Sequence, residues 1–198
     1  MHPKSSFNSD LKKEKLLQYF LDIQYQKHLK LYTFKRNNSL KDQLLGVDIY
    51  LTHKVTNKQY SVDEKAQLDY INEDLPTFAF ELSYLKNGTV KPGWFIDSKK
   101  TTDFYGLVTS IYCDEPNKFT SCKYYFVNRV KLIDYLSSRI NLKSIERPQK
   151  HGISLVPNLF AKKEGYLYLS SKNKIEQPLN LILKLDFLIK NNVAKQLF

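Results

Sequence analysis

Two neighbouring segments of the chain alternate apolar and polar side chains and carry charged residues inside the alternation. Residues 47–52 follow this pattern around Asp48, and residues 60–67 follow it around Asp63 and Lys65. A period of two is typical of a β-strand with two different faces. Burying an unpaired charge costs several kcal/mol or shifts its pKa until it neutralises. The sequence therefore predicts two strands whose charged side chains compensate one another or bind an ion.

The rest of the chain predicts further helices and strands without a repeat or a linker. Apolar residues at helical spacing predict helices over residues 10–30 and 129–141, separated from the first strand by a polar break at 35–39. Residues 179–184 suit a strand, although the stretch up to Ile189 also suits a helix. Further strands are predicted over 77–84, 104–113, 119–127 and 166–169, with a short strand or strand end at 93–97. The economical interpretation is one α+β domain over residues 1–198.

Composition limits the class of protein. The 198 residues are 42% hydrophobic and 14% aromatic, which is ample for a folded core. No apolar run approaches the ~20 residues that span a bilayer, and the first residues lack the apolar core of a secretory signal. Cys113 and Cys122 are too few for a disulfide framework and have no zinc-like spacing. These features favour a reduced, cytoplasmic setting and no membrane partner.

The chain is strongly basic, with a net charge of +11 and a pI of about 9.4. A basic surface favours polyanions, of which nucleic acid is the commonest inside cells. Lysine enrichment also accompanies general solubility, and the lysines are scattered along the chain. The charge therefore supports a nucleic-acid partner without establishing one.

The strand pattern places particular charges on one face. If Ile49 faces one side of its strand, Asp48 faces the other, while Asp63 and Lys65 share a face that Glu64 does not. Neighbouring antiparallel strands lie about 5 Å apart, so Asp48 and Asp63 could approach one metal ion. Mg²⁺ prefers carboxylate, carbonyl and water oxygens, and a nearby lysine could orient a water or stabilise charge on a phosphate.

This arrangement resembles the PD-(D/E)XK superfamily, the restriction-endonuclease-like nucleases. Asp48 and then Asp63-Glu64-Lys65 as the D-x-K element carry the resemblance, together with the helix before them and the consecutive strands. Val47 stands where the superfamily has proline. The resemblance covers residues of about 10–112, with the strands and helices of 119–198 extending that core. It implies a restriction-endonuclease-like mixed β-sheet flanked by helices, an α/β-type core within a single α+β domain.

The resemblance also implies roles for individual residues. Asp48 and Asp63 would be ligands of Mg²⁺, with Mn²⁺ as an alternative, and Lys65 would be the catalytic lysine. Glu81, expected on a neighbouring strand, would complete the metal-binding and catalytic set. Glu64 stands where the superfamily usually has an apolar residue. It is expected to lie at the rim, to pair with a lysine, or to replace Asp63 as ligand if a bulge shifts the register.

Each of these assignments has a plainer alternative. D-x-K and E-x-K tripeptides are common on solvated strands, and Glu81 would equally suit a strand-edge charge paired with a lysine. Glu14 on the first helix is a weaker candidate acid, because a solvated helix face among lysines explains it better.

Together these features predict a Mg²⁺-dependent endonuclease that hydrolyses phosphodiester bonds in DNA with a metal-activated water and a catalytic lysine. Many nucleases of this type act as homodimers, although the sequence carries no interface signal. One alternative is a catalytically silent nuclease-like module that binds nucleic acid or a protein partner. Another is an unrelated α+β protein whose acids form surface salt bridges.

Overall fold

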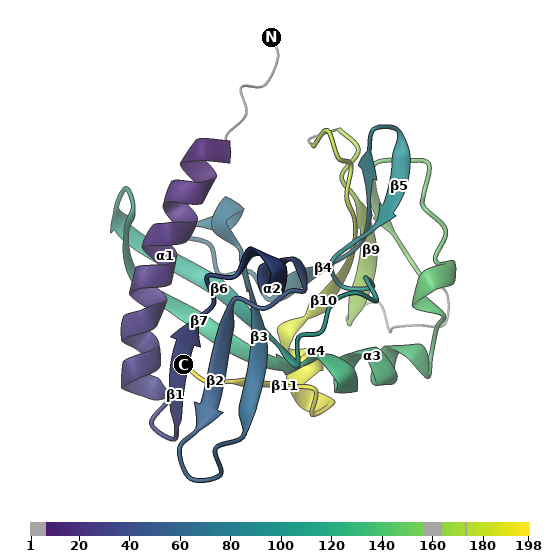
Figure 1. Ribbon diagram of the computed structural model, residues 1–198. Helices are drawn as coiled ribbons and strands as arrows, with labels where there is room; N and C mark the ends of the chain where they lie inside the picture. The colour runs from purple at the N-terminus through teal and green to yellow at the C-terminus, as the bar shows by residue number, and fades with distance from the viewer. Residues whose placement is uncertain (1–6, 157–163, 173) are drawn as a thin grey trace.

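The computed structural model describes residues 7–156, 164–172 and 174–198, which form a mixed α+β domain with two β-sheets and four α-helices (Figure 1). The helices are α1 (Phe7–His28), α2 (Leu40–Leu44), α3 (Arg129–Ser137) and α4 (Leu185–Lys190), with single 3₁₀ turns at Leu68–Tyr70 and Leu142–Ser144. Among the described residues, no helix has both the length and the apolar character needed to cross a membrane.

The first sheet is mixed and has six strands in the order β1-β2-β3-β6-β7-β11. Neighbouring strands run antiparallel except β3 and β6, which are parallel. Residues 67–103 therefore leave this sheet after β3, and the chain then re-enters it as β6, on the edge of β3 that β2 does not occupy. The strands are β1 (Tyr32–Arg36), β2 (Ile49–His53), β3 (Gln59–Ala66), β6 (Phe104–Glu115), β7 (Lys118–Asn128) and β11 (Ala194–Gln196).

The second sheet has five antiparallel strands in the order β5-β4-β10-β9-β8. Its strands come from the middle and the end of the chain. They are β4 (Thr77–Lys86), β5 (Thr89–Pro92), β8 (Gly152–Ser154), β9 (Gly165–Leu169) and β10 (Leu179–Lys184).

The first sheet lies between two hydrophobic clusters. On one face, Leu17, Leu21 and Tyr25 of α1 pack at helical spacing against residues such as Ile49 and Val62. On the other face, side chains of β6 and β7 pack against the second sheet, α3 and α4 in a larger cluster. Consecutive residues of β3 therefore point into two different environments, and this separation positions the candidate site.

Most predicted elements are confirmed, with α1 in place of the helix expected over 10–30 and β3 in place of the strand expected over 60–67. Residues 179–190 are a strand followed directly by a helix, so both interpretations of that stretch are partly right. The short strand or strand end expected at 93–97 is wrong. Those residues form a turn in which the backbone N–H groups of Ile96 and Asp97 both donate to the carbonyl of Gly93.

Candidate active site

The register of the β2–β3 hairpin brings Asp48 and Asp63 together. Ile49 pairs with Val62, and the N–H of Asp48 donates to the carbonyl of Val62 at 2.9 Å, which places Asp48 opposite Asp63. Asp48 Oδ2 also accepts from the backbone N–H of Glu64 at 2.7 Å. The Asp48 side chain is thereby fixed at the point where β2 begins.

Asp63 is a buried acid with an incomplete set of partners. The residue is 1% exposed, and its Oδ1 forms an ion pair with Lys65 Nζ. Its buried Oδ2 has no hydrogen-bond partner among the described residues. Burial raises the pKa of Asp63 to about 6; the Lys65 ammonium counteracts this rise, and the neighbouring Asp48 carboxylate adds to it. Two carboxyl groups on neighbouring strands at this register favour a shared proton or a bound cation between them.

Gly46 packs closely beside this unpartnered oxygen. A Cβ at Gly46 would lie 3.1 Å from Asp63 Oδ2 and 3.0 Å from Lys100 Cδ, so any larger residue would crowd both. Gly46 also ends the short helix α2 with a φ of +81°, a conformation that L-residues rarely adopt. Lys100 covers the same region and donates from Nζ to the carbonyl of Leu44 at 3.0 Å.

Lys65 lies between Asp63 and the protein surface. It lies on the same face of β3 as Asp63, and its side chain is 28% exposed. Its ammonium group pairs with Asp63 and lies 5.4 Å from the centre of the Trp94 ring. The ammonium is therefore held against both a carboxylate and an aromatic face, at the edge of a surface cavity that Lys65 lines.

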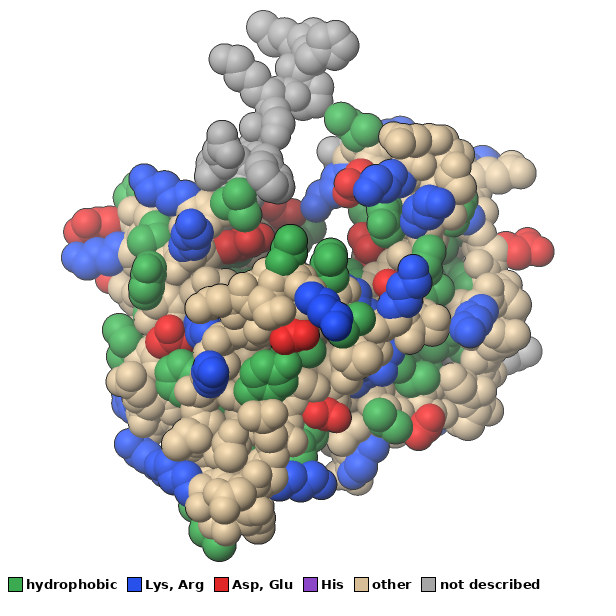
Figure 2. Space-filling view, viewed as in Figure 1, with side chains coloured by type: hydrophobic (Ala, Val, Ile, Leu, Met, Phe, Trp, Pro, Cys, Tyr) green, Lys and Arg blue, Asp and Glu red, His purple; other side chains and the backbone are tan. Residues whose placement is uncertain are grey.

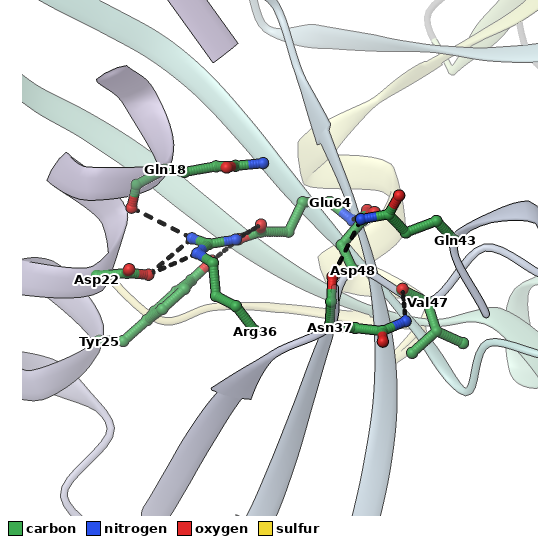
Figure 3. Close-up of polar contacts among 9 residues, drawn as sticks. All are labelled: Gln18, Asp22, Tyr25, Arg36, Asn37, Gln43, Val47, Asp48 and Glu64. Atoms are coloured by element: carbon green, nitrogen blue, oxygen red, sulfur yellow. Dashed lines mark hydrogen bonds and ion pairs between the residues drawn. The ribbon is translucent and has the colours of Figure 1, made fainter. Parts of the chain in front are cut away.

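Glu64 points to the opposite face of β3, toward α1 (Figure 3). Its carboxylate accepts hydrogen bonds from the Tyr25 hydroxyl and the Arg36 guanidinium, which also contacts Asp22 at 2.8 Å. Burial raises the pKa of Glu64, while Arg36 opposes this rise. This network links α1, β1 and β3.

The three expectations for Glu64 are therefore wrong in detail. Its side chain is 9% exposed and lies within the fold rather than at the rim, and its partner is an arginine rather than a lysine. The β2–β3 register carries no bulge, so Asp63 keeps its place beside Asp48. The role of Arg36 was not predicted from the sequence, because residues 35–39 were interpreted as a polar break. The alternation of Tyr32 and Phe34 just before it could have predicted the strand β1, which ends at Arg36.

The expectation that Glu81 lies on a strand next to β3 is wrong, because β4 belongs to the second sheet. Burial raises the pKa of Glu81, and the backbone N–H of Trp94 lowers it by hydrogen bonding to the carboxyl. Glu81 instead lines the same cavity as Lys65, from the facing sheet. Glu14 is exposed on α1 and lines a neighbouring hollow of about 340 Å³ together with Asp48 and Lys65.

The site offers two carboxylates, those of Asp48 and Asp63, to a divalent cation. Within residues 7–156, 164–172 and 174–198, no group of three or more His, Cys, Asp or Glu side chains is placed to hold a metal. Mg²⁺, however, commonly binds through one or two carboxylates and keeps several waters. Asp48 and Asp63 would be the two carboxylates of such a site, and because Asp63 Oδ2 is buried beside Gly46 and Lys100, a hydrated ion would enter only after Lys65 or Lys100 moves.

Comparison of this chain with protein-family models, with characterised proteins and with solved structures finds no match. The resemblance to the PD-(D/E)XK superfamily therefore stays an expectation drawn from Asp48 and Asp63-Glu64-Lys65 in the sequence.

Proposed function

We propose that the protein is a metal-dependent nuclease that hydrolyses phosphodiester bonds in DNA. The observation that carries the proposal is the buried Asp63 carboxyl opposite the half-buried Asp48, with one unpartnered oxygen and the Lys65 ammonium directly beside it. A buried acid pair lowers stability unless a proton or a cation compensates it, so the arrangement favours a functional site.

Each side chain of the site has a definite task in this proposal. Asp48 and Asp63 would hold Mg²⁺ or Mn²⁺, and the bound ion would supply polarisation of the phosphate and a more acidic water. Lys65 places a positive charge next to the phosphate and stabilises the charge that develops there during cleavage. Glu64 acts indirectly, because its backbone N–H holds the Asp48 carboxylate in position.

The arrangement of helix α1 and the mixed sheet supports the same proposal. We infer a restriction-endonuclease-like core in which α1 packs on a mixed sheet and the β2–β3 hairpin carries the acids, with β6 parallel to β3. The net charge of +11 provides basic side chains outside the site to bind flanking phosphates. That contribution weakens steeply as salt concentration rises.

Nicking of a supercoiled plasmid in Mg²⁺ tests the proposal. The wild-type protein is expected to nick DNA, and Asp63→Asn and Lys65→Ala are expected to lose at least 100-fold in rate, in line with the loss of a charge-stabilising group. Asp74→Asn is the matched control, since Asp74 is an exposed acid paired with Lys123 away from the site. Undiminished nicking by both site variants would refute these assignments.

A second candidate is a catalytically silent module that binds nucleic acid. Burial of the Asp63 side chain, which is 2% exposed, favours it, because a substrate phosphate reaches that carboxylate only if Lys65 or Lys100 moves. Calorimetry separates the two candidates. DNA binding without Mg²⁺ or Mn²⁺ binding would favour the silent module.

A further inference from the structure

A cavity of about 440 Å³ opens beside Lys65. Its walls are the end of β3 with the 3₁₀ turn that follows, and the face of the second sheet that is turned away from the main hydrophobic cluster. Figure 1 shows α1 on one side of this region and the second sheet on the other, and Figure 2 shows a hollow between them with charged side chains around it. The lining residues that matter here are Lys65, Gln67, Tyr70, Trp94, Tyr168 and Asn180.

Aromatic side chains give the cavity flat, rigid surfaces. Trp94 packs against Tyr105 with ring centres 5.1 Å apart, so the indole is held in place. Tyr168 is positioned by His151, whose Nε2 lies 3.4 Å from the tyrosine hydroxyl. Tyr70 is 46% exposed at the rim. Flat aromatic groups of this kind stack nucleobases irrespective of sequence, because every base has a π-face.

Amide side chains supply the polar contacts that a base edge needs. Gln67 donates from Nε2 to the carbonyl of Thr77 at 2.9 Å, and its buried Oε1 has no hydrogen-bond partner among the described residues. Asn180 lines the facing wall. Small-molecule sites typically combine such apolar walls with a few polar groups, in cavities of about 300–1,000 Å³.

Part of the charge around the cavity is paired, and the partly buried carboxyl of Glu81 on the wall disfavours an anionic group inside, so the cavity itself suits a neutral ligand. Lys65 pairs with Asp63, and Lys174 pairs with Asp69 at 3.1 Å across the rim. A phosphate would bind next to the ammonium group of Lys65, at the end of the cavity nearest Asp48 and Asp63. A neutral planar group fits the remainder of the cavity.

We propose that this cavity holds one unpaired nucleobase of the substrate, next to the phosphate at Lys65. The substrate is therefore single-stranded at the bond that is cut, either throughout or at an end or gap. The inference deepens the proposed nuclease function and rests on it for the position of the phosphate. A base within a duplex enters such a cavity only after unpairing and unstacking, which disfavours an intact duplex.

Tryptophan fluorescence provides a direct test, because Trp94 is the single tryptophan of the chain. The wild-type protein in EDTA, where cleavage is prevented, is titrated with an octadeoxyadenylate, with the ribo-octamer, and with a hairpin duplex of the same length. Saturable quenching by the single strands, at least 10-fold tighter than by the hairpin, is expected. The deoxy and ribo arms identify which backbone the site prefers.

Two variants show whether the ligand occupies this cavity. Tyr70→Ala should weaken single-strand binding by roughly 5- to 150-fold, the usual effect of removing one stacked aromatic group. Tyr19→Ala should change binding less than twofold, because Tyr19 lies 70% exposed on α1 and does not line the cavity.

Different results would overturn the base-binding cavity and the nuclease activity. Equal or tighter binding of the hairpin, or unchanged binding by Tyr70→Ala, would overturn the base-binding cavity even if the protein cleaves DNA in Mg²⁺. Absence of Mg²⁺-dependent cleavage of both single strands and plasmid would reject the nuclease. Single-strand quenching that Tyr70→Ala weakens would then still support the cavity as a base-binding site.

Discussion

Replacing Asp63 by asparagine is expected to stabilise the folded protein in the absence of a metal. Burial and Asp48 hold the pKa of Asp63 at about 6, above its ordinary value of 3.8, although Lys65 partly opposes them. Because one pKa unit corresponds to ~1.36 kcal/mol, ionised Asp63 destabilises the fold by on the order of 3 kcal/mol. In a domain of this size, that is a rise in Tm of roughly 6–12 °C for Asp63→Asn.

The stability gained by Asp63→Asn depends on pH. Since the pKa is higher in the folded state, the folded protein binds more protons between about pH 4 and pH 6. The stability contributed by this carboxyl therefore falls as pH rises through that window and stays low above it. The advantage of Asp63→Asn should be complete at pH 7.5 and absent near pH 4.

Urea denaturation in EDTA at pH 7.5 and pH 4 measures this effect. Asp74→Asn is the control, because Lys123 holds the pKa of that exposed carboxyl below its usual range, so this variant should lose a little stability at pH 7.5, less than ~1 kcal/mol. A variant Asp63→Asn that is less stable than the wild type at pH 7.5 would refute the argument that the acid pair is a destabilising site.

Two further perturbations test the surroundings of the site. Arg36→Ala leaves Glu64 buried without its cation and should cost about 3–5 kcal/mol in urea denaturation, most of which the double variant with Glu64→Gln should recover; full stability of Arg36→Ala would contradict the network. Gly46→Ala should reduce Mg²⁺-dependent nicking at least 10-fold, because its Cβ crowds Asp63 Oδ2. Gly88→Ala is the control, because Gly88 also has a positive φ (+73°) but open space around it, so the variant carries only the backbone strain of ~1 kcal/mol and should leave nicking unchanged. Equal loss of nicking in both alanine variants would disprove the crowding at Gly46.

The local part of the site was predictable because a hairpin is a local structure. Alternation around Asp48 and Asp63, with a turn between the strands, determines which side chains face each other. It correctly places Glu64 on the other face of β3. The partner of Glu64 was not predictable in this way, because Arg36 and Tyr25 come from other elements whose packing depends on the tertiary structure.

The placement of Glu81 failed for a non-local reason. The alternating pattern of residues 77–84 fits a strand in either sheet equally well, and nothing within it specifies its neighbours. In the structure, the chain leaves the first sheet after β3, and β6 takes the adjacent place in parallel orientation. Long-range strand pairing, rather than local propensity, decided that Glu81 faces Lys65 across a cavity.

Titration with Mn²⁺ followed by electron paramagnetic resonance tests most directly whether the two aspartates are a cation site. Wild-type protein at pH 7.5 should bind one Mn²⁺ that Mg²⁺ displaces, and both Asp48→Asn and Asp63→Asn should weaken that binding at least 10-fold. Wild-type protein that leaves all Mn²⁺ free, or both variants binding as tightly as the wild type, would contradict the account.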